Sequence, residues 1–575
     1  MAIRRFRKLR TLILVVLALG VVSYFFRSDS EVTIEPGSTL VIELEGAYIE
    51  ASGGSWIANV LGESERTFSS VLTNLAVAER DERIKNVVIV IRPLQIGWGK
   101  AEELRGAIRR LQEAGRNTIA YLDMASMGGN IEYFVASSAG EVYLTPAGSL
   151  PVVGLAANYL FLGGLWEKLG VTFDVGKAGK YKSAVETYTS EEMSPASLEM
   201  ANSLLDSINE IFISGIMQGR SMTREEVVAA IDRGPMLGEG LRESNLIDHV
   251  EYLDSVLSDL GGPVVEESDY SSVMPVDVGF SPVASIALIY GSGAVVQGRA
   301  SQTPRGGAVF ASQTAAEAIH KAATDSSFDA IILRIDSPGG SALASEHIWR
   351  SVEKARGEGK PIVASYSDVA ASGGYYASVG ADEIVSNAGA YTGSIGVFAI
   401  RPVLGGALSE IGIQSKALTR GRHADFLVSS EPLSERGLAR LQSLVMDIYG
   451  VFLDRVAAGR DLSVEKVDEV AQGRVWTGAQ AKEVGLVDRI GGLHESVAAV
   501  RERLGLDPEA DVALIPFPPP RGFAEELASL FQARVDPMAA GLELLPQAFE
   551  SMYDWLGEVS FEEPLAIPPF WVDMR

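Results

Sequence analysis

Short apolar runs alternate along the chain with stretches whose apolar residues recur at helical spacing. Apolar runs occupy residues 331–335, 361–365 and 383–386, and Ala-rich stretches with helical periodicity occupy residues 71–78 and 314–322. Short apolar runs favour buried strands, and the helical period favours amphipathic helices. Strands that alternate with helices in this way predict an α/β fold built on parallel sheets.

The apolar pattern occurs twice. The matching segments are 39–49 with 285–295, 87–92 with 331–336, and 236–250 with 476–490, at separations of 246, 244 and 240 residues. So long a period indicates a duplicated domain and not a solenoid repeat. The sequence therefore predicts two homologous domains in tandem, residues 38–260 and 284–505, joined by a polar linker at 261–283.

Both ends of the chain differ from the duplicated body. Five cations within residues 1–10 precede an apolar run that begins at Thr11. Positive charge before an apolar segment predicts a cytoplasmic N-terminus, a transmembrane anchor at 11–27 and a body on the far side of the membrane. The alternative is a cleaved signal peptide, but no small-residue cleavage motif follows the run. At the other end, several prolines interrupt the pattern, and residues 506–575 are expected to form an appended arm.

Composition removes several kinds of chemistry. The 575 residues include no cysteine, which excludes disulfides, thiolate catalysis and Cys-ligated metals. With 75 acidic and 49 basic residues the net charge is −26, whereas nucleic-acid binding requires basic surface. The neighbouring acids Glu63 and Glu65, and Glu225 and Glu226, lack metal-ligand spacing. Neither a metal nor another cofactor is predicted.

Two glycine-rich turns in the second domain each lie between a predicted strand and a predicted helix. They are I-D-S-P-G-G at 335–340 and A-A-S-G-G-Y at 370–375. Ser372 is flanked by small residues and is therefore accessible as a nucleophile, and the amide that follows it, on Gly373, can hold an oxyanion. The glycines of the first turn let a second amide approach the same point. By itself, however, S-G-G is also a common tight turn with a helix-capping serine.

A nucleophilic serine needs a general base. None of the five histidines joins a serine and an acid in a recognisable triad; they are His249, His320, His347, His423 and His494. A lysine whose pKa is lowered by burial is the alternative base. The segment G-K-Y-K-S-A-V-E at 179–186 offers Lys182, although a lysine among other cations is more typical of solvated surface.

Four motifs in order along the chain carry a family resemblance. They are Y-K-S-A-V-E at 181–186, D-S-P-G-G at 336–340, A-S-G-G-Y at 371–375 and T-G-S-I-G-V at 392–397. Together with the anchor and the duplication, they resemble the long, duplicated form of the S49 serine peptidases, the signal peptide peptidase A family. The resemblance implies two ClpP/crotonase-like domains, hydrolysis through an acyl-enzyme, no cofactor, and cleaved signal peptides and similar apolar peptides as substrates. It also implies a single-pass protein of the bacterial inner membrane with a periplasmic body, assembled as a homo-oligomer, a tetramer in this family.

The same resemblance assigns roles to individual residues. The positions that match the family's functional residues are the nucleophile Ser372, the general base Lys182, the lysine-orienting Ser394, and the oxyanion amides of Gly373 and of Gly339 or Gly340.

The duplication supports this assignment from within the chain. Aligning the glycine pairs places Met127 opposite Ser372, and the first half also lacks a Gly-Gly pair at 92–96. Aligning the lysine segment places Ala424 opposite Lys182. Each half thus lacks what the other keeps, so the halves are expected to dock with Lys182 facing Ser372, preferably within one chain.

Two other functions share some of these features. A crotonase-like acyl-CoA enzyme would use the same fold and oxyanion turns, but it would act in the cytosol, against which the predicted anchor argues. An inactive envelope scaffold would have no need of both Ser372 and Lys182.

Overall fold

The computed structural model describes residues 33–50, 66–125, 128–234, 236–300, 308–519 and 565–566. The predicted anchor at 11–27, Met127 and most of the predicted arm lie outside these residues. Within the described ranges, no helix is both long enough and apolar enough to cross a membrane.

The first half is built on a six-stranded sheet in which every pairing is parallel. In spatial order its strands are β8 (His249–Val250), β4 (Glu141–Leu144), β3 (Asn117–Leu122), β2 (Ile84–Gln95), β1 (Ser38–Ala47) and β9 (Val264–Glu266). The central strands are buried over most of their length, as the near-continuous apolar runs of parallel sheets require.

The second half repeats this order. Its parallel strands are β20 (Arg489–Ile490), β16 (Glu383–Ser386), β15 (Ile362–Ala371), β13 (Ala330–Ser337), β10 (Ala284–Ser292) and β21 (Val512–Pro516). A short antiparallel pair also recurs, β5 (Ser149–Leu150) with β7 (Met236–Leu237) and β17 (Tyr391–Gly393) with β19 (Val475–Thr477). The duplicated α/β architecture is therefore confirmed.

Each sheet extends beyond the predicted limits of its domain by one edge strand. β9 lies within the predicted linker, and β21 lies within the predicted C-terminal arm. Both are short and follow polar segments, so the apolar pattern alone did not assign them to the sheets. Each pairs in parallel with the first strand of its own half and becomes the new edge strand of that sheet.

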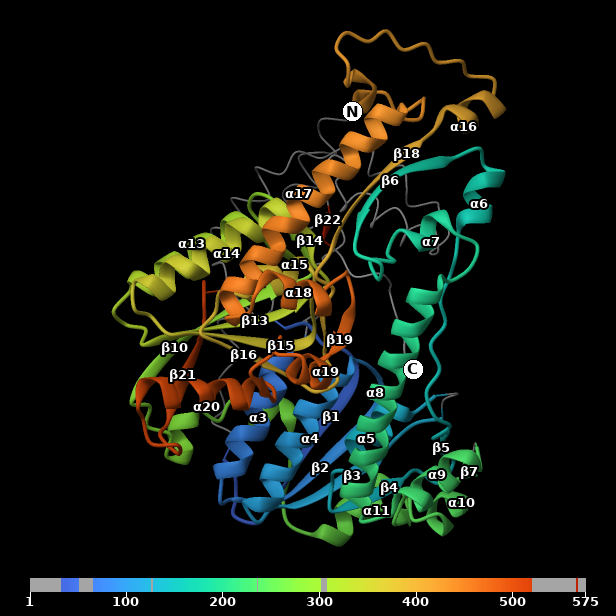
Figure 1. Cartoon of the computed structure of the whole chain (residues 1–575). Coiled ribbons are helices and arrows are strands. Elements are labelled where there is room, and N and C mark those ends of the chain that lie inside the picture. Colours follow the sequence, from blue (N-terminus) through green and yellow to red (C-terminus); the bar gives the residue numbers. More distant parts are fainter. Residues whose placement is uncertain are drawn as a thin grey trace, which may run out of the picture.

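Helices cover both sheets in equivalent positions. Crossover helices are α3 (Phe68–Arg80) and α4 (Trp98–Glu113) in the first half, and α13 (Ser312–Thr324) and α14 (Ala342–Gly357) in the second. Two 26-residue helices correspond, α8 (Pro195–Arg220) and α17 (Glu435–Arg460), and each begins at a capping serine, Ser194 or Ser434. Figure 1 shows the first sheet (blue) below the second, with α4 between them and in contact with β15.

The remaining described helices are short. They are α5 (Asn130–Ala136), α6 (Gly163–Lys168), α7 (Glu186–Thr189), α9 (Arg224–Asp232), α10 (Gly238–Glu243), α11 (Leu253–Leu260), α12 (Glu267–Tyr270), α15 (Gly373–Ser378), α16 (Gly405–Glu410), α18 (Val464–Val470), α19 (Gly478–Glu483), α20 (Leu493–Leu504) and the 3₁₀ helices η1 (Pro275–Val278) and η2 (Ala424–Leu427).

A third sheet joins the two halves. Its strands are β12 (Val309–Ala311), β11 (Ala294–Val296), β14 (Gly340–Ser341), β22 (Leu565–Ala566), β18 (Val397–Val403) and β6 (Thr172–Ala178). β6 belongs to the first half and pairs antiparallel with β18 of the second along seven residues, from Ala178↔Val397 to Thr172↔Val403. Figure 1 shows these two strands side by side in the projection at the top of the molecule, which is distinct from the C-terminal arm.

Equivalent hydrogen bonds align the two halves differently from the glycine pairs. Tyr133 Oη donates to the Leu246 carbonyl at 2.7 Å, and Tyr375 Oη donates to the Leu486 carbonyl at 2.9 Å. Tyr133 and Tyr375 are 242 residues apart, and this separation places Asn130 opposite Ser372. The expected match of Met127 with Ser372 is therefore wrong by three residues. The glycine pair precedes helix α5 in the first half but lies inside helix α15 in the second.

Candidate active site

Ser372 stands at the turn between β15 and α15. Its backbone has a φ of 53° and a ψ of −112°, and residues other than glycine rarely adopt a positive φ. The Ser372 amide donates to the Gly393 carbonyl oxygen at 2.8 Å, and the side chain is buried. A strained strand-to-helix turn of this kind places a serine hydroxyl at the end of a strand. The sequence pattern predicted an accessible hydroxyl, but Ser372 is completely buried, because the small residues that flank it are themselves packed inside the protein.

Lys182 reaches Ser372 from the loop between β6 and α7. Its Nζ lies 2.7 Å from Ser372 Oγ, 2.9 Å from Ser394 Oγ and 2.9 Å from the Ser394 carbonyl oxygen. Lys182 is completely buried, and burial lowers its pKa well below the usual value. Three residues that the sequence singled out are thus brought together within one chain.

The contacts of Lys182 can be satisfied by a neutral amine. A neutral amine carries two N–H groups and one lone pair. When the N–H groups donate to the two Ser394 oxygens, the lone pair is left facing the Ser372 hydroxyl. Burial favours this neutral form, so the geometry and the lowered pKa both suit Lys182 to accept a proton from Ser372.

Residues 472–474 hold both sides of this contact. The Tyr181 amide donates to the Gln472 carbonyl at 2.8 Å, and the Ser394 amide donates to the Arg474 carbonyl at 2.7 Å. Between them, Gly473 has a φ of 76°, and a Cβ there would lie 2.6 Å from the Lys182 backbone nitrogen. Only glycine allows this approach. No local motif marks these residues, and sequence reasoning missed them.

The predicted oxyanion donors lie in two glycine-rich turns that contact each other, 335–340 and 370–375. Gly373 begins α15, where amides have no partner inside the helix. A Cβ on Gly374 would lie 2.9 Å from the Ser337 carbonyl oxygen, so the two glycine turns are in contact. The Gly339 amide donates to Ser337 Oγ at 3.2 Å and is therefore committed to its own turn. Of the two candidates in that turn this leaves Gly340, which itself pairs with Val295 of β11 and Ala566 of β22.

The equivalent positions in the other half lack this chemistry. At a separation of 242 residues, the equivalent pairs are Asn130 with Ser372, Val152 with Ser394, and Lys182 with Ala424. Asn130 Nδ2 donates to the Gly154 carbonyl at 2.9 Å and so stabilises a turn. The chain therefore contains one complete Ser–Lys site within its described residues, divided between two halves.

A cluster of buried charges lies between the halves, and sequence reasoning missed it too. Its members come from both halves: Glu50, Lys100, Glu103, Arg334, Asp336 and Asp368. One signal was available, because Arg334 interrupts an otherwise apolar strand, I-I-L-R-I-D, and a charge in a buried parallel strand needs partners.

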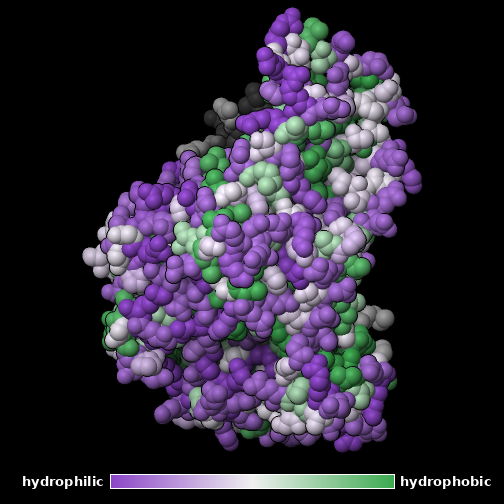
Figure 2. Space-filling model, viewed as in Figure 1, coloured by the Kyte–Doolittle hydropathy of each residue, from purple (hydrophilic) through white to green (hydrophobic). Residues whose placement is uncertain are grey.

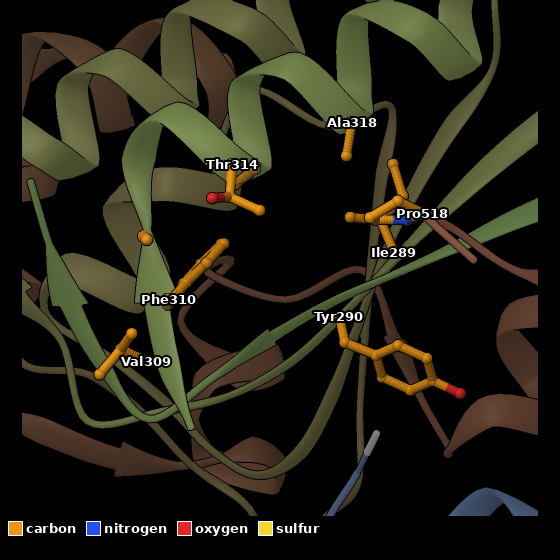
Figure 3. Close-up of a pocket in the computed structure, with 9 residues that line it drawn as sticks. Ile289, Tyr290, Val309, Phe310, Thr314, Ala318 and Pro518 are labelled. Atoms are coloured by element: carbon orange, nitrogen blue, oxygen red, sulfur yellow. The ribbon is translucent and has the colours of Figure 1, made fainter. Parts of the chain in front are cut away.

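A small cavity elsewhere in the second half is separate from this site. It lies between α13 and β10, has a volume of about 40 Å³ and is lined by Phe310, Thr314 and Pro518 among others (Figure 3). Its lining includes none of the residues around Ser372.

The fold and the site together define a class of protein. A tandem α/β chain that buries a strained serine against a lysine whose pKa is lowered by burial, beside a glycine-rich turn, has the arrangement of a serine hydrolase. The sequence profile described as Peptidase family S49 matches residues 110–262 in the first half and 354–507 in the second. The chain belongs to peptidase family S49.

Curated relatives agree with this assignment. The chain is 34% identical over 494 residues to "Serine protease SPPA, chloroplastic" of Arabidopsis thaliana, covering 84% of this chain and 71% of the relative. It is 30% identical over 508 residues to "Protease 4" of Haemophilus influenzae, covering 84% and 78%. A solved structure of a mutant membrane-bound stomatin-specific protease in complex with a substrate peptide aligns with 43% of this chain and 98% of its own, at 17% identity and a TM-score of 0.26. The chain is a serine peptidase.

Proposed function

We propose that this chain is a membrane-anchored endopeptidase that cleaves peptide bonds with a Ser372–Lys182 dyad through an acyl-enzyme. The observation that carries the proposal is the 2.7 Å contact between Lys182 Nζ and Ser372 Oγ, made where burial lowers the pKa of the lysine. A lysine that is neutral near physiological pH can act as a general base.

The proposed reaction proceeds in two halves. Lys182 Nζ takes the hydroxyl proton as Ser372 Oγ attacks the peptide carbonyl carbon, and the amides of Gly373 and Gly340 hold the oxyanion. The Lys182 ammonium then gives its proton to the leaving amine, the C–N bond breaks, and an ester to Ser372 remains. Water attacks the ester carbon while Lys182 takes its proton. The C–O bond to Ser372 then breaks, and Lys182 returns the proton to Ser372 Oγ. Ser394 keeps the lysine oriented throughout.

The position of β22 supports a mode of peptide binding. The backbone of Leu565–Ala566 lies between β14 and β18 and pairs antiparallel with both. A substrate in extended conformation would take the same place, with main-chain hydrogen bonds supplying affinity. The strand beside this place is largely apolar, V-F-A-I at 397–400 of β18, which favours apolar peptides such as cleaved signal peptides.

Anchoring and assembly form part of the same proposal. Residues 11–27 would span the inner membrane with the N-terminus in the cytoplasm and the catalytic body in the periplasm. Copies of the chain would assemble, as a tetramer by family resemblance, through the projection built on β6 and β18. Figure 2 shows hydrophobic surface on this projection, where Leu165, Leu169, Ile411 and Ile413 are exposed. Light scattering after size-exclusion chromatography tests the assembly, and a monomer would contradict it.

Peptide cleavage by the full-length, detergent-solubilised protein tests the chemistry. We expect Ser372→Ala and Lys182→Ala each to lower kcat by about 10³-fold or more, because each removes one member of an interdependent pair. Lys180→Ala is the matched control, since Lys180 is an exposed lysine two residues away. A fluorophosphonate probe should label Ser372 in the folded wild type.

Each outcome separates the rivals. If Lys182→Ala kept near wild-type turnover, the base assignment would be wrong while the nucleophile could stand. Hydrolysis of an acyl-CoA without cleavage of any peptide would favour a crotonase-like enzyme. A folded wild type that is not labelled at Ser372 would indicate an inactive scaffold.

A further inference from the structure

The strand that leads to Ser372 contains a bulge. β13 and β15 pair in parallel from Ile331↔Ile362 to Ile335↔Tyr366, and the next paired residues are Ser337↔Ala370. One residue of β13, Asp336, therefore faces the three residues 367–369 of β15. Bulges beside active sites change the direction of the strand that follows. This bulge sets the course of β15 into the Ser372 turn.

Side chains of the second half bond to the bulged segment, one of them through a backbone amide. Asp336 Oδ1 accepts the Val369 amide at 3.2 Å. The Arg334 guanidinium donates to Ser365 Oγ at 3.2 Å and to Ser367 Oγ at 2.9 Å. Asp336 directly precedes the turn that carries Gly340, so its carboxylate connects the oxyanion turn to the nucleophile strand.

The first half contacts the same bulge through the start of α4. The Asp368 carboxylate accepts the amides of Gly97 at 3.0 Å and Lys100 at 2.8 Å, and so caps the helix. The approach is close, since a Cβ on Gly99 would lie 2.1 Å from the Ser367 carbonyl oxygen. Two glycines thus let α4 dock directly on the backbone of β15.

Lys100 contacts three carboxylates in this region. Its Nζ lies 2.8 Å from Asp368 Oδ2 and 3.3 Å from Glu50 Oε1, and it also forms a short ion pair with Asp336. Only 3% of Lys100 is exposed. Burial disfavours its charge, but the surrounding carboxylates outweigh burial and hold its pKa well above the usual value. Lys100 is therefore a permanent cation, unlike Lys182.

We propose that Lys100 is a positioning residue for catalysis: by bridging Asp336 and Asp368 it fixes the β15 bulge, and with it the Ser372 hydroxyl, relative to the oxyanion turn. The inference rests on the proposed function of Ser372. On this view the first half contributes twice to one active site. Lys182 supplies the base, and Lys100 holds the nucleophile and the oxyanion donors in register.

Steady-state peptide cleavage by the full-length protein tests this role. Lys100→Met keeps the aliphatic stem and removes the cation, and Lys85→Met is the control at an exposed lysine of the same half. Because small displacements of reacting groups cost about 10²-fold, we expect Lys100→Met to lower kcat by about 10- to 100-fold. KM should change by less than about threefold, since Lys100, Asp336 and Asp368 belong to α4, β13 and β15, whereas the peptide is proposed to bind between β14 and β18. Both variants are assayed below their melting temperatures, and kcat is expressed per folded molecule.

A folded Lys100→Met protein with kcat within about threefold of wild type would overturn the proposal. A loss of kcat/KM that comes entirely from a rise in KM would overturn it as well. If Lys100→Met does not fold, Asp368→Asn decides by the same criteria, because it removes one of the bridged carboxylates at nearly constant volume. If the wild-type protein were as inactive toward peptides as the Ser372→Ala variant, the proposed function itself would be refuted.

Discussion

Replacing Ser394 with alanine tests how the lysine is held. Ser394→Ala removes one of the three oxygens around Lys182 Nζ and leaves the Ser394 carbonyl and Ser372 Oγ in place. A hydrogen bond to a neutral group contributes about 1 kcal/mol, and one to a charged group about 1.5–3 kcal/mol. In the proposed reaction Lys182 is neutral before the attack and becomes charged as Ser372 attacks. Losing this difference in hydrogen-bond energy, about 0.5–2 kcal/mol, lowers kcat by about 2- to 30-fold.

The same substitution changes the pH dependence with a defined sign. Ser394 Oγ accepts a hydrogen bond from the lysine and so favours its ammonium form. Its removal should lower the pKa of Lys182 further, and the rise of kcat with pH should move to lower pH. A variant that is slower at its optimum and yet relatively more active in acid distinguishes this effect from simple destabilisation.

The assay is kcat against pH with a peptide substrate for the full-length wild type and variant. Ser496→Ala is the matched control, because Ser496 is also buried and donates one hydrogen bond, to the Gly492 carbonyl at 2.8 Å. The control should leave both kcat and its pH dependence unchanged. An unchanged profile in Ser394→Ala, or a shift to higher pH, would refute the orienting role.

Three further substitutions test the surroundings. Burial raises the pKa of Glu102 to about 7, so its contribution to stability is present below its ordinary pKa of 4.5 and is lost as pH rises through 7. Glu102→Gln should therefore raise the urea unfolding free energy at pH 8 by about 1–3 kcal/mol and leave it unchanged at pH 4; equal effects at both pH values would contradict this. Gly473→Ala should lower kcat at least about tenfold, because its Cβ would displace Lys182, and an unchanged kcat would show that the loop tolerates it. Arg334→Met leaves the buried Glu103 without its ion pair and Glu50 with Lys100 alone; it should cost about 3–5 kcal/mol in urea unfolding, and a cost below about 1 kcal/mol would refute the pairing.

The sequence predicted the duplicated α/β fold and the residues that meet at the site. Apolar periodicity was sufficient for the strands because buried parallel strands are apolar on both faces. The limits of the two domains stay predictions, and the edge strands β9 and β21 fall outside them. Alignment by glycine pairs placed Met127 where hydrogen bonds place Asn130, because a glycine pair does not show whether it precedes a helix or lies within it.

The positioning contacts could not be predicted in this way. Lys100 lies on an amphipathic helix, where a lysine is ordinarily solvated, and its burial depends on Asp368, 268 residues further along the chain. The contact of Lys182 with residues 472–474 is likewise set by the docking of the halves. Such effects arise from tertiary packing between segments that carry no common local pattern.

The pairing of β6 with β18 has a consequence for how the chain can be divided. A fragment ending in the segment between the halves would retain β6 with no neighbour, and the complementary fragment would expose β18 as an open edge. Unpaired edges recruit other strands, so each fragment alone would be prone to self-association. When the two fragments are mixed, pairing of β6 with β18 should restore turnover. The fraction of turnover recovered would measure how far this one antiparallel pairing is sufficient to assemble the site.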